Sequence, residues 1–312
     1  MEYIQLKNSD LQVSRFCMGG CPMGGYGWGD VQNRELIDAV HQALDQGVNF
    51  FDTADTYGLG ESEKTLAQGL DSHRKDVVIA SKFGVRTGNG KTVYDNSPEY
   101  IQQALENSLR RLNTDYIDLY IIHYRDGVTP IADVVGKMEQ LKQQGKIRYF
   151  GLSNIHADGM KELIPYAGKF VSCQDEFSLA CRKYENDLKL VQEKLQVSPM
   201  TWGSLGQGIL TGKYTRENVN FGSNDRRSRD IYVNFHGEKL EQNLRIVDVL
   251  KRIAAERDKS VAACAIRYIL DYLPGSVVLA GVKRPAQLHS NLEAMNWTMT
   301  QEELAWLDAV SK

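Results

Sequence analysis

Short apolar runs recur along the chain, and each has the length of one buried strand. They cover residues 16–18, 48–51, 77–80, 117–122, 147–152, 170–173, 198–202 and 276–280. Between and after them, apolar residues recur every three or four positions, which predicts helices over residues 33–44, 61–70, 97–112, 131–144, 187–195, 238–257, 260–270, 285–293 and 300–310. Strands that alternate with helices pair in parallel, so the pattern predicts an α/β fold.

Eight strand and helix units in 312 residues favour a closed (β/α)8 barrel over a doubly wound sheet. The glycine-rich segment 19–27 lacks the Gly-x-Gly-x-x-Gly spacing that a doubly wound nucleotide-binding sheet carries after its first strand. Residues 3–6 and 11–13 flank a polar turn and predict a hairpin that could plug the bottom of the barrel. We predict one domain over residues 1–312, with extra helices near the C-terminus and a long functional loop at about 203–237.

Composition and charge argue against several classes of protein. The formal net charge of -3 provides no positive field for nucleic acid or an anionic membrane. The first residues lack the order of a signal peptide, and no apolar run reaches the length of a membrane span. We therefore expect a soluble cytoplasmic protein with no nucleic-acid or membrane partner. The five cysteines, at positions 17, 21, 173, 181 and 264, show no metal-ligand spacing, so we expect them to be reduced and predict no metal.

Ionisable residues follow three consecutive predicted strands. Asp52 and Tyr57 come after the second strand, Lys82 ends the third and His123 ends the fourth. The carboxyl ends of barrel strands meet at one mouth, so these four side chains should lie together. An ammonium beside a phenol lowers the phenol's pKa from its usual value near 10, and we expect Lys82 to do so for Tyr57. Asp52 would hold Lys82 charged, and His123 would orient a substrate carbonyl. Such a group suits carbonyl reduction and its reverse.

Each of these residues alone has an ordinary structural explanation. A single Asp or Lys at a strand end is usually a solvated charge, and a single His or Tyr there usually packs. Only their shared position at one end of consecutive strands favours a catalytic role over a structural one. A different barrel enzyme, such as a Schiff-base aldolase that uses Lys82, stays open at this point.

Several longer motifs carry a resemblance to a known family. They are Phe-Asp-Thr-Ala-Asp-Thr-Tyr-Gly at 51–58 with the helix start at 61–69, Ser-Lys-Phe at 81–83, the segment 112–123, Gly-Leu-Ser-Asn at 151–154, and Gln-Gly-Ile-Leu-Thr-Gly-Lys-Tyr at 207–214. With them the chain resembles the aldo-keto reductases over essentially its full length. It is most similar to the bacterial general reductases, close to those found with inositol catabolism, and more distantly to potassium-channel β subunits.

The resemblance implies a (β/α)8 barrel that binds NADP(H) across its mouth, with Asp52, Tyr57, Lys82 and His123 as the catalytic tetrad. It implies that Ser153, Asn154 and Gln174 hold the nicotinamide carboxamide. It also implies that Trp202 stacks on the nicotinamide ring. The other cofactor-binding positions that it implies are Gly20, Cys21, Gly203, Ser204, Leu205, Gln207, Gly208, Lys213, Arg226, Gly281, Lys283, Arg284, Gln287 and Asn291.

Cofactor choice and substrate are less well determined. Lys283 and Arg284 beside a helix N-terminus suit a phosphate monoester and favour NADP, although NAD(H) stays possible and both could be exposed cations of a turn. Three departures from the family pattern bear on cofactor affinity, namely Asp175, Gly203-Ser204 and Ser290. Around the mouth we expect a mixture of aromatic and cationic groups that suits sugars and aromatic aldehydes alike: Met23, Tyr26, Trp28, Phe83, Arg86, Tyr94, Tyr124 and Arg229.

The function predicted from the sequence is an NADP-dependent oxidoreductase that interconverts a small aldehyde or ketone and its alcohol, with Tyr57 as general acid and base. A cofactor-sensing regulatory subunit, like the channel β subunits, is the alternative from another class. We expect it less, because the chain begins directly at the predicted hairpin.

Overall fold

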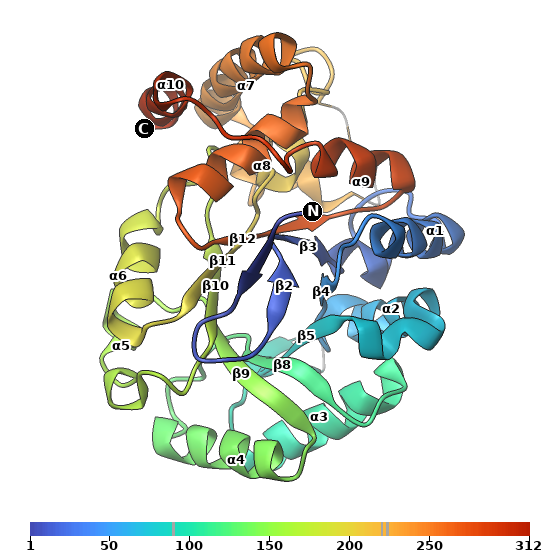
Figure 1. Ribbon diagram of the computed structural model, residues 1–312, viewed down its shortest axis with the longest axis vertical. Helices are drawn as coiled ribbons and strands as arrows, with labels where there is room; N and C mark the ends of the chain where they lie inside the picture. The colour runs from blue at the N-terminus through green and yellow to red at the C-terminus, as the bar shows by residue number, and fades with distance from the viewer. Residues whose placement is uncertain (89–90, 220, 223–224) are drawn as a thin grey trace.

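Strands and helices alternate in the computed structural model, which describes residues 1–88, 91–219, 221–222 and 225–312. Within these residues, eight parallel strands close into a barrel in the order β3, β4, β5, β8, β9, β10, β11 and β12 (Figure 1). The predicted (β/α)8 barrel is therefore confirmed. The strands are Phe16–Gly19 (β3), Phe50–Asp52 (β4), Val78–Phe83 (β5), Ile117–Ile122 (β8), Ile147–Ser153 (β9), Ser172–Glu176 (β10), Ser198–Trp202 (β11) and Val277–Gly281 (β12).

Each strand overlaps the apolar run that predicted it, but β10 is shifted toward its carboxyl end. The run at 170–173 is apolar, whereas the strand continues through Gln174 to Glu176, which pairs with Trp202 of β11. Polar residues often end a barrel strand at the mouth, so apolar character stops before the strand does. The shift therefore marks the functional end of the barrel.

A layer of helices surrounds the strands (Figure 1). They are Asn33–Asp45 (α1), Glu61–Leu70 (α2), Pro98–Leu112 (α3), Ile131–Gln143 (α4), Ala157–Met160 (α5), Glu185–Leu195 (α6), Gly237–Arg257 (α7), Val261–Tyr272 (α8), Pro285–Leu292 (α9) and Gln301–Ser311 (α10). Side-chain caps begin several of them. Ser97 accepts from the backbone N–H of Tyr100, and Thr300 forms a capping box with Glu303. Of the helices in the described ranges, none combines the length and the apolar character that a bilayer crossing requires.

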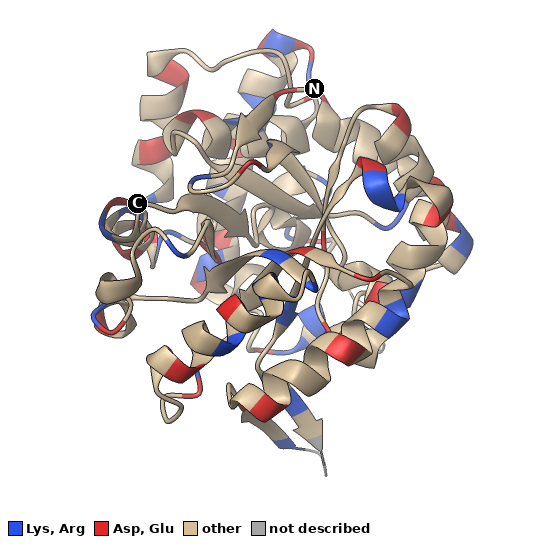
Figure 2. Ribbon diagram, turned by 60° about the horizontal axis from the view of Figure 1, so that its bottom comes forward, with Lys and Arg blue, Asp and Glu red and all other residues tan. Residues whose placement is uncertain are grey.

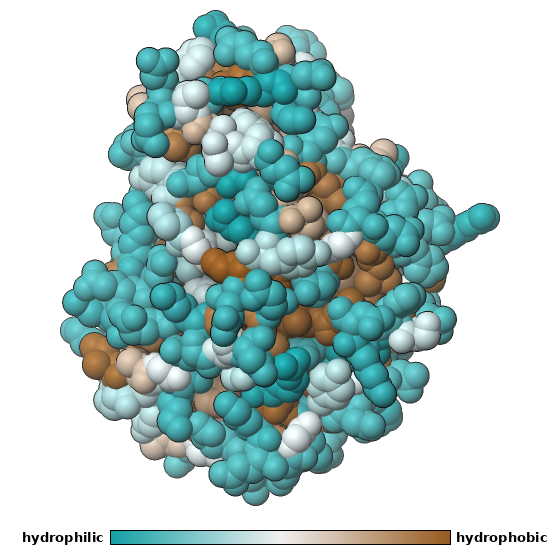
Figure 3. All heavy atoms as spheres, viewed as in Figure 1, coloured by the Kyte–Doolittle hydropathy of each residue, from teal (hydrophilic) through white to brown (hydrophobic). Residues whose placement is uncertain are grey.

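The N-terminal hairpin, made of β1 (Tyr3–Gln5) and β2 (Gln12–Ser14), lies across one end of the barrel (Figure 1). Its apolar residues Leu6, Leu11 and Val13 are buried in the same cluster as Cys17 and Phe50 of the barrel interior. The predicted plug is thus present, and it closes the base. The face of the molecule on this side is mostly hydrophilic, with hydrophobic residues in the hollows between polar ones (Figure 3).

A second hairpin was not predicted. Strands β6 (Val85–Gly88) and β7 (Lys91–Tyr94) pair antiparallel after β5, with Val85 opposite Tyr94. Figure 2 shows it projecting from the body of the molecule, while acidic and basic residues alternate along the outer helices. The Asn-Gly pair at 89–90, whose residues lie outside the described ranges, is a hairpin signal in the sequence.

The described residues of the expected loop at 203–237 include three short 3-10 helices, η5 (Gly206–Thr211), η6 (Arg226–Ser228) and η7 (Val233–Phe235).

Candidate active site

Side-chain alternation along the strands directs the predicted tetrad into the mouth. Successive residues of a strand face opposite sides, so every second residue points into the barrel. Asp52, Lys82 and His123 each lie two residues beyond a side chain of the inner apolar cluster. Those inner side chains are Phe50, Ala80 and Ile121. The three polar groups therefore stand one layer above the apolar interior, at the end opposite the N-terminal hairpin.

Asp52 and Lys82 form a buried ion pair at the centre of the site. Lys82 Nζ lies 2.6 Å from Asp52 Oδ1, 2.9 Å from the carbonyl oxygen of Thr53 and 3.3 Å from the hydroxyl of Tyr57. The second carboxylate oxygen, Asp52 Oδ2, accepts from Gln174 Nε2 at 2.7 Å. A buried ion pair is stable when its remaining protons and lone pairs are also satisfied, and here they are. With all three ammonium protons engaged, Lys82 is poorly placed to attack a carbonyl, which argues against the aldolase alternative.

The pKa of Tyr57 differs from the prediction. Burial, and secondly the negative charge of Asp52, raises the pKa of Tyr57 well above its ordinary value. The expectation that Lys82 lowers this pKa is wrong, because Asp52 compensates the charge of Lys82. A phenol with a raised pKa stays protonated at neutral pH, so Tyr57 is available as a proton donor.

Two glycines set the position of Tyr57. Gly58 has φ +61, a region that favours glycine, and a Cβ added there would collide with the backbone of Gly24. In turn, a Cβ on Gly24 would lie 2.6 Å from the backbone nitrogen of Gly58. The loop after β3 and the segment that carries Tyr57 therefore pack backbone against backbone, and any side chain at either glycine would displace the phenol.

His123 completes the group of four. Burial, and secondly the charge of Lys82, lowers the pKa of His123 well below its ordinary value, so the imidazole is neutral. Its ring meets the ring of Tyr57 edge-on, with centroids 5.9 Å apart, and stacks on Tyr124 at 5.1 Å. A neutral imidazole carries one N–H donor, which suits a carbonyl oxygen better than a second charge would. The structure thus brings Asp52, Tyr57, Lys82 and His123 together, and their catalytic roles stay predictions.

An acidic residue behind the tetrad was not singled out in the sequence. Asp55 Oδ1 is buried and has no hydrogen-bond partner among the described residues. Burial, and secondly the negative charge of Glu63, raises the pKa of Asp55 to about 7. Glu63 is itself satisfied, since it accepts from Ser81 Oγ and from Arg111 Nε, both at 2.6 Å. The buried Oδ1 without a partner is unusual, because buried polar atoms are normally hydrogen-bonded.

The residues expected to hold a carboxamide lie beside the tetrad. Asn154 Nδ2 donates to the carbonyl oxygen of His123 at 3.0 Å and to Ser153 Oγ at 2.9 Å. Gln174 Nε2 is committed to Asp52. Both amide nitrogens therefore brace the site, and the amide oxygens are the groups that suit the N–H donors of a carboxamide. The bond between Gln174 and Asp52 was not foreseen from the sequence.

Trp202 ends β11 at the mouth. It packs half-buried against the inner apolar cluster, and its backbone carbonyl accepts from Phe177. The unusual Gly203-Ser204 pair forms the turn that follows. Gly203 has φ +66, and Ser204 Oγ donates back to the carbonyl oxygen of Thr201 at 2.8 Å. The indole is thus at the level where the family resemblance places a ring stacked on the nicotinamide.

Positive charges gather beside this turn. Burial, and secondly the charges of Arg227 and Lys213, lowers the pKa of Lys283, and Arg284 acts in the same direction. Arg227 is paired with Asp225, whereas Lys213, Lys283 and Arg284 have no carboxylate partner in the described part of the chain. Mutually repelling cations of this kind indicate a site for anionic groups, as the phosphates of a nicotinamide dinucleotide would be.

The backbone of the same loop contributes less than its side chains. Gly206, Gln207 and Gly208 have successive positive φ angles of +54, +54 and +104. The N–H groups of Gly206 and Gly208 already donate to the carbonyl oxygens of Gly203 and Leu205. The residues present therefore fit the predicted cofactor on charge. Leu205, just before them, is half-buried against the core.

Arg226 and Arg227 differ in their surroundings. Arg226 is one of the predicted cofactor-binding positions, and its guanidinium lies over the ring of Trp28, 4.6 Å from the centroid, and 3.8 Å from Cys21 Sγ. Arg227, which was not predicted, is buried and donates to the carbonyl oxygen of Gln207 at 3.2 Å. The Asp-Arg-Arg-Ser sequence does not distinguish the two arginines. The difference in their surroundings arises from the turn of η6. The role of Arg226 stays a prediction.

The remaining predicted cofactor positions fall on the loops around the mouth. Gln287 Oε1 accepts from the backbone N–H of Lys283 at 2.9 Å, and Asn291 is buried on α9. Gly281 ends β12, and Arg284 precedes α9. On the other side, Gly20 donates its N–H to the carbonyl oxygen of Asp52 at 2.6 Å, and Cys21 begins a short 3-10 helix.

Two residues expected at the mouth are elsewhere. Phe83 is fully buried and packs on Tyr120, since it follows the inward-facing Lys82 and therefore points outward. Met23 is also buried in the outer core. Asp175 likewise faces outward from β10, where Asp175 Oδ2 lies 3.5 Å from His156 Nε2. That departure from the family pattern does not reach the tetrad.

Comparisons with known proteins agree with this geometry. The aldo/keto reductase family matches residues 15–312. The chain is 32% identical over 306 residues to the aldo-keto reductase YhdN of Bacillus subtilis, covering 97% of this chain and 91% of the relative. It is 31% identical over 322 residues to the NADH-specific methylglyoxal reductase of Escherichia coli, covering 97% and 96%.

Solved structures give the same result. The glycerol dehydrogenase AKR11B4 from Gluconobacter oxydans superposes with a TM-score of 0.88 at 32% identity, covering 99% of this chain and 94% of the other. An aldo-keto reductase from Klebsiella pneumoniae, solved in complex with NADP and acetate, has a TM-score of 0.75 at 25% identity, covering 98% and 94%. With the barrel, the buried group of four and these matches together, the chain belongs to the aldo/keto reductase family.

Proposed function

We propose that this protein interconverts a small aldehyde or ketone and its alcohol, with NADP(H) as the redox cofactor and Tyr57 as the general acid and base. The observation that carries the proposal is the position of Lys82 Nζ, 2.6 Å from Asp52 and 3.3 Å from the hydroxyl of Tyr57, at the mouth beside His123. This arrangement supplies one proton donor, one charge that stabilises the resulting phenolate and one neutral hydrogen-bond donor.

In the reducing direction, the O–H bond of Tyr57 breaks and its proton passes to the substrate's carbonyl oxygen. The phenolate left behind gains the full attraction of Lys82, while Asp52 keeps that ammonium in place. A hydrogen bond from the imidazole of His123 orients the carbonyl. When bound, a reduced nicotinamide supplies the hydride that the carbonyl carbon receives. One proton and one hydride convert the carbonyl to an alcohol, and solvent returns the proton to Tyr57.

We favour NADP(H) because of the cations beside α9. Lys283 and Arg284 precede a helix N-terminus, where a phosphate monoester is stabilised by charge and by backbone N–H groups. The Klebsiella structure is described in complex with NADP, which supports this choice. The Escherichia coli relative is described as NADH-specific, so both cofactors belong in the test.

The test is a panel of small aldehydes, ketones and sugars with NADPH and with NADH, followed by the absorbance of the reduced nicotinamide. Tyr57→Phe should lower kcat by a factor of about 100 or more, because general acid catalysis contributes about 100- to 10,000-fold. Cofactor binding should be nearly unchanged. Tyr3→Phe, which removes a hydroxyl bonded to Gly47 at the base of the barrel, is the matched control and should keep full activity.

Near-normal turnover by Tyr57→Phe would show that another group supplies the proton. If the wild-type protein binds a cofactor tightly but turns over no carbonyl in the panel, the cofactor-sensing alternative becomes the better explanation.

A further inference from the structure

The orientation of the His123 ring needs an explanation. A histidine that donates to a substrate must present one particular nitrogen, and a hydrogen bond to its other nitrogen usually fixes the ring. Here Nδ1 of His123 is buried and has no hydrogen-bond partner within the described residues. The ring contacts that the structure shows are both aromatic, namely the edge-on contact with Tyr57 and the stack on Tyr124. Aromatic packing, rather than a hydrogen bond to Nδ1, therefore holds the imidazole ring in its orientation.

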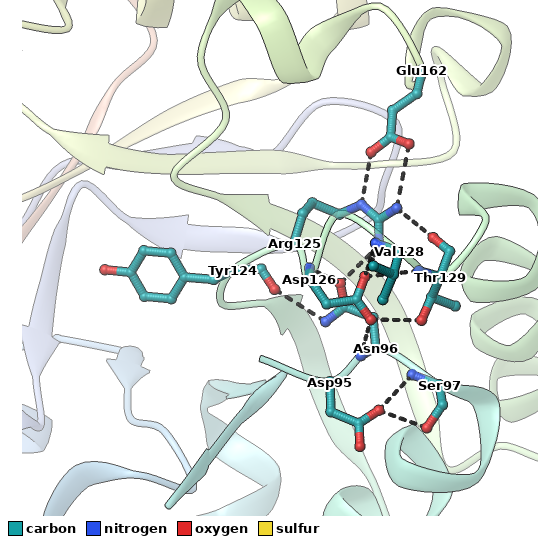
Figure 4. Close-up of polar contacts among 9 residues, drawn as sticks. All are labelled: Asp95, Asn96, Ser97, Tyr124, Arg125, Asp126, Val128, Thr129 and Glu162. Carbon is teal, nitrogen blue, oxygen red and sulfur yellow. Dashed lines mark hydrogen bonds and ion pairs between the residues drawn. The ribbon is translucent and has the colours of Figure 1, made fainter. Parts of the chain in front are cut away.

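Tyr124 is held in place by a polar cluster around its backbone. Its carbonyl oxygen accepts from the side chain of Asn96 at 3.0 Å, and Asn96 is fully buried. The side-chain oxygen of Asn96 accepts in turn from Arg125 Nη1 at 2.8 Å and from the backbone N–H of Asp126 at 2.9 Å. Arg125 also donates to Glu162 Oε1 at 2.8 Å. Figure 4 shows the cluster on one side of the backbone and the ring of Tyr124 extending away from it on the other.

A third ring covers the outer face of the stack. Tyr94 of β7 lies with its centroid 5.2 Å from that of Tyr124, at an interplanar angle of 31°. The hairpin that carries it is anchored at its base, where Asp95 donates its N–H to the carbonyl oxygen of Gly84 and pairs with Arg86 at 2.7 Å. Tyr94 stays 47% exposed, so it faces solvent on one side and Tyr124 on the other.

We propose that Tyr124 is a positioning residue for His123, and that Tyr94 supports it from the β6–β7 hairpin. The kinetic part of this inference rests on the proposed function, in which His123 orients the carbonyl. The stack on Tyr124 covers one face of the imidazole and Tyr57 meets the ring edge-on, and these two contacts limit rotation of the imidazole plane. The hairpin thereby contributes to the catalytic centre without touching the reacting atoms.

The first test reads the ring contact directly and needs no turnover. The chain has 6 histidines, so the His123 ring signals can be assigned by NMR from their loss in His123→Gln. A ring stacked on Tyr124 feels its aromatic current, which displaces the imidazole proton signals. Tyr124→Leu should abolish that displacement, whereas Tyr124→Phe, which keeps the ring, should preserve it. Unchanged signals in Tyr124→Leu would overturn the proposal.

The second test is kinetic. Tyr124→Leu should lower kcat about tenfold or more with little change in cofactor KM, because small misplacement of a catalytic group is costly. Tyr124→Phe should stay within about twofold of the wild type. The exposed variant Tyr94→Leu, which leaves the buried layers intact, should show a smaller loss in the same direction. Tyr149→Leu, at the barrel base, is the control for losing a half-buried tyrosine and should not change kcat.

A double-mutant cycle separates positioning from other roles. In a His123→Gln background, Tyr124→Leu should cost little more, since the residue that it positions is already gone. An equally large loss in both backgrounds would mean that Tyr124 acts directly on substrate or on folding, and would refute the inference. If no variant or wild-type protein reduces a carbonyl but the NMR displacement follows the ring, the positioning contact stands and the proposed reaction fails.

Discussion

The carboxyl of Asp55, whose buried Oδ1 has no hydrogen-bond partner among the described residues, makes stability depend on pH in a definite direction. Its pKa is raised from 3.8 to about 7 in the folded protein, first by burial and then by Glu63. A carboxyl whose folded pKa lies above its unfolded pKa holds its proton more tightly when folded. Its contribution to stability is therefore complete below about pH 4 and is lost as the pH rises toward about 7. Asp55→Asn replaces the carboxyl with a neutral group of the same shape and removes this dependence.

The magnitude follows from the size of the pKa shift. A shift of one unit corresponds to about 1.4 kcal/mol, so the full shift of about 3 units sets an upper bound of about 4 kcal/mol. Between pH 5 and pH 8, the proton-linkage relation gives a loss of stability of about 2.6 kcal/mol out of that upper bound. Asp55 is partly accessible as a residue although its Oδ1 atom is buried, and residual solvation reduces the figure. We expect the variant to gain about 1 to 2 kcal/mol over the wild type on going from pH 5 to pH 8.

The assay is urea unfolding of both proteins at the two pH values. For each protein, the change in the free energy of unfolding between the two pH values is measured. One change is then subtracted from the other, so that the contributions of all other titrating groups cancel. Asp38→Asn, on the exposed face of α1, is the matched control and should show the same pH dependence as the wild type. An equal change in wild type and Asp55→Asn would mean that Asp55 is solvated or hydrogen-bonded in the folded protein, and the reasoning would be wrong.

Two further predictions concern the cofactor. Replacing both Lys283 and Arg284 with Ala should weaken NADPH binding by about 1.5 to 3 kcal/mol for each lost charge-assisted contact and barely change NADH binding, as titration calorimetry would measure. Equal losses for the two cofactors would show that the pair does not recognise a phosphate. Trp202→Ala should weaken both cofactors alike, by about 1 to 3 kcal/mol if aromatic stacking on bases is a fair guide. Trp202→Phe should remove most of the indole fluorescence quench on cofactor binding, and a quench that survives would place Trp202 away from the nicotinamide.

The pattern of apolar runs in the sequence predicted the barrel well because buried strands recur along the chain. Each barrel strand carries apolar side chains on both faces, so a short apolar run is enough to find it. Strand ends were less predictable. The polar residues Gln174 to Glu176 continue β10 into the mouth, and no apolar signal marks them. Strand β7 is exposed, and the apolar residues of β6 and β7, Val85, Val93 and Tyr94, form no run long enough to mark a buried strand, so only the turn sequence could have revealed the hairpin.

The group of four was predictable in position but not in its electrostatics. Its members follow consecutive strands, and strand order brings them together. The raised pKa of Tyr57 depends on burial and on how Asp52 and Lys82 compensate each other, which only the assembled site determines. The bond between Gln174 and Asp52 joins residues 122 positions apart and depends on closure of the barrel. By contrast, side-chain alternation alone could have excluded Phe83 from the mouth, since Lys82 occupies the inward position.

The backbone contact between Gly24 and Gly58 constrains how this protein could be redesigned. Loops at the mouth of a barrel are the usual place to widen or narrow a substrate pocket, because they tolerate change better than strands do. Here the segment around Gly24 also packs directly against the backbone that carries Tyr57, so lengthening it or adding a side chain would reshape the mouth and move the Tyr57 phenol at once. The β6–β7 hairpin lacks that contact. Libraries aimed at new substrates should therefore vary the hairpin residues other than Tyr94, which supports Tyr124, and leave both glycines untouched.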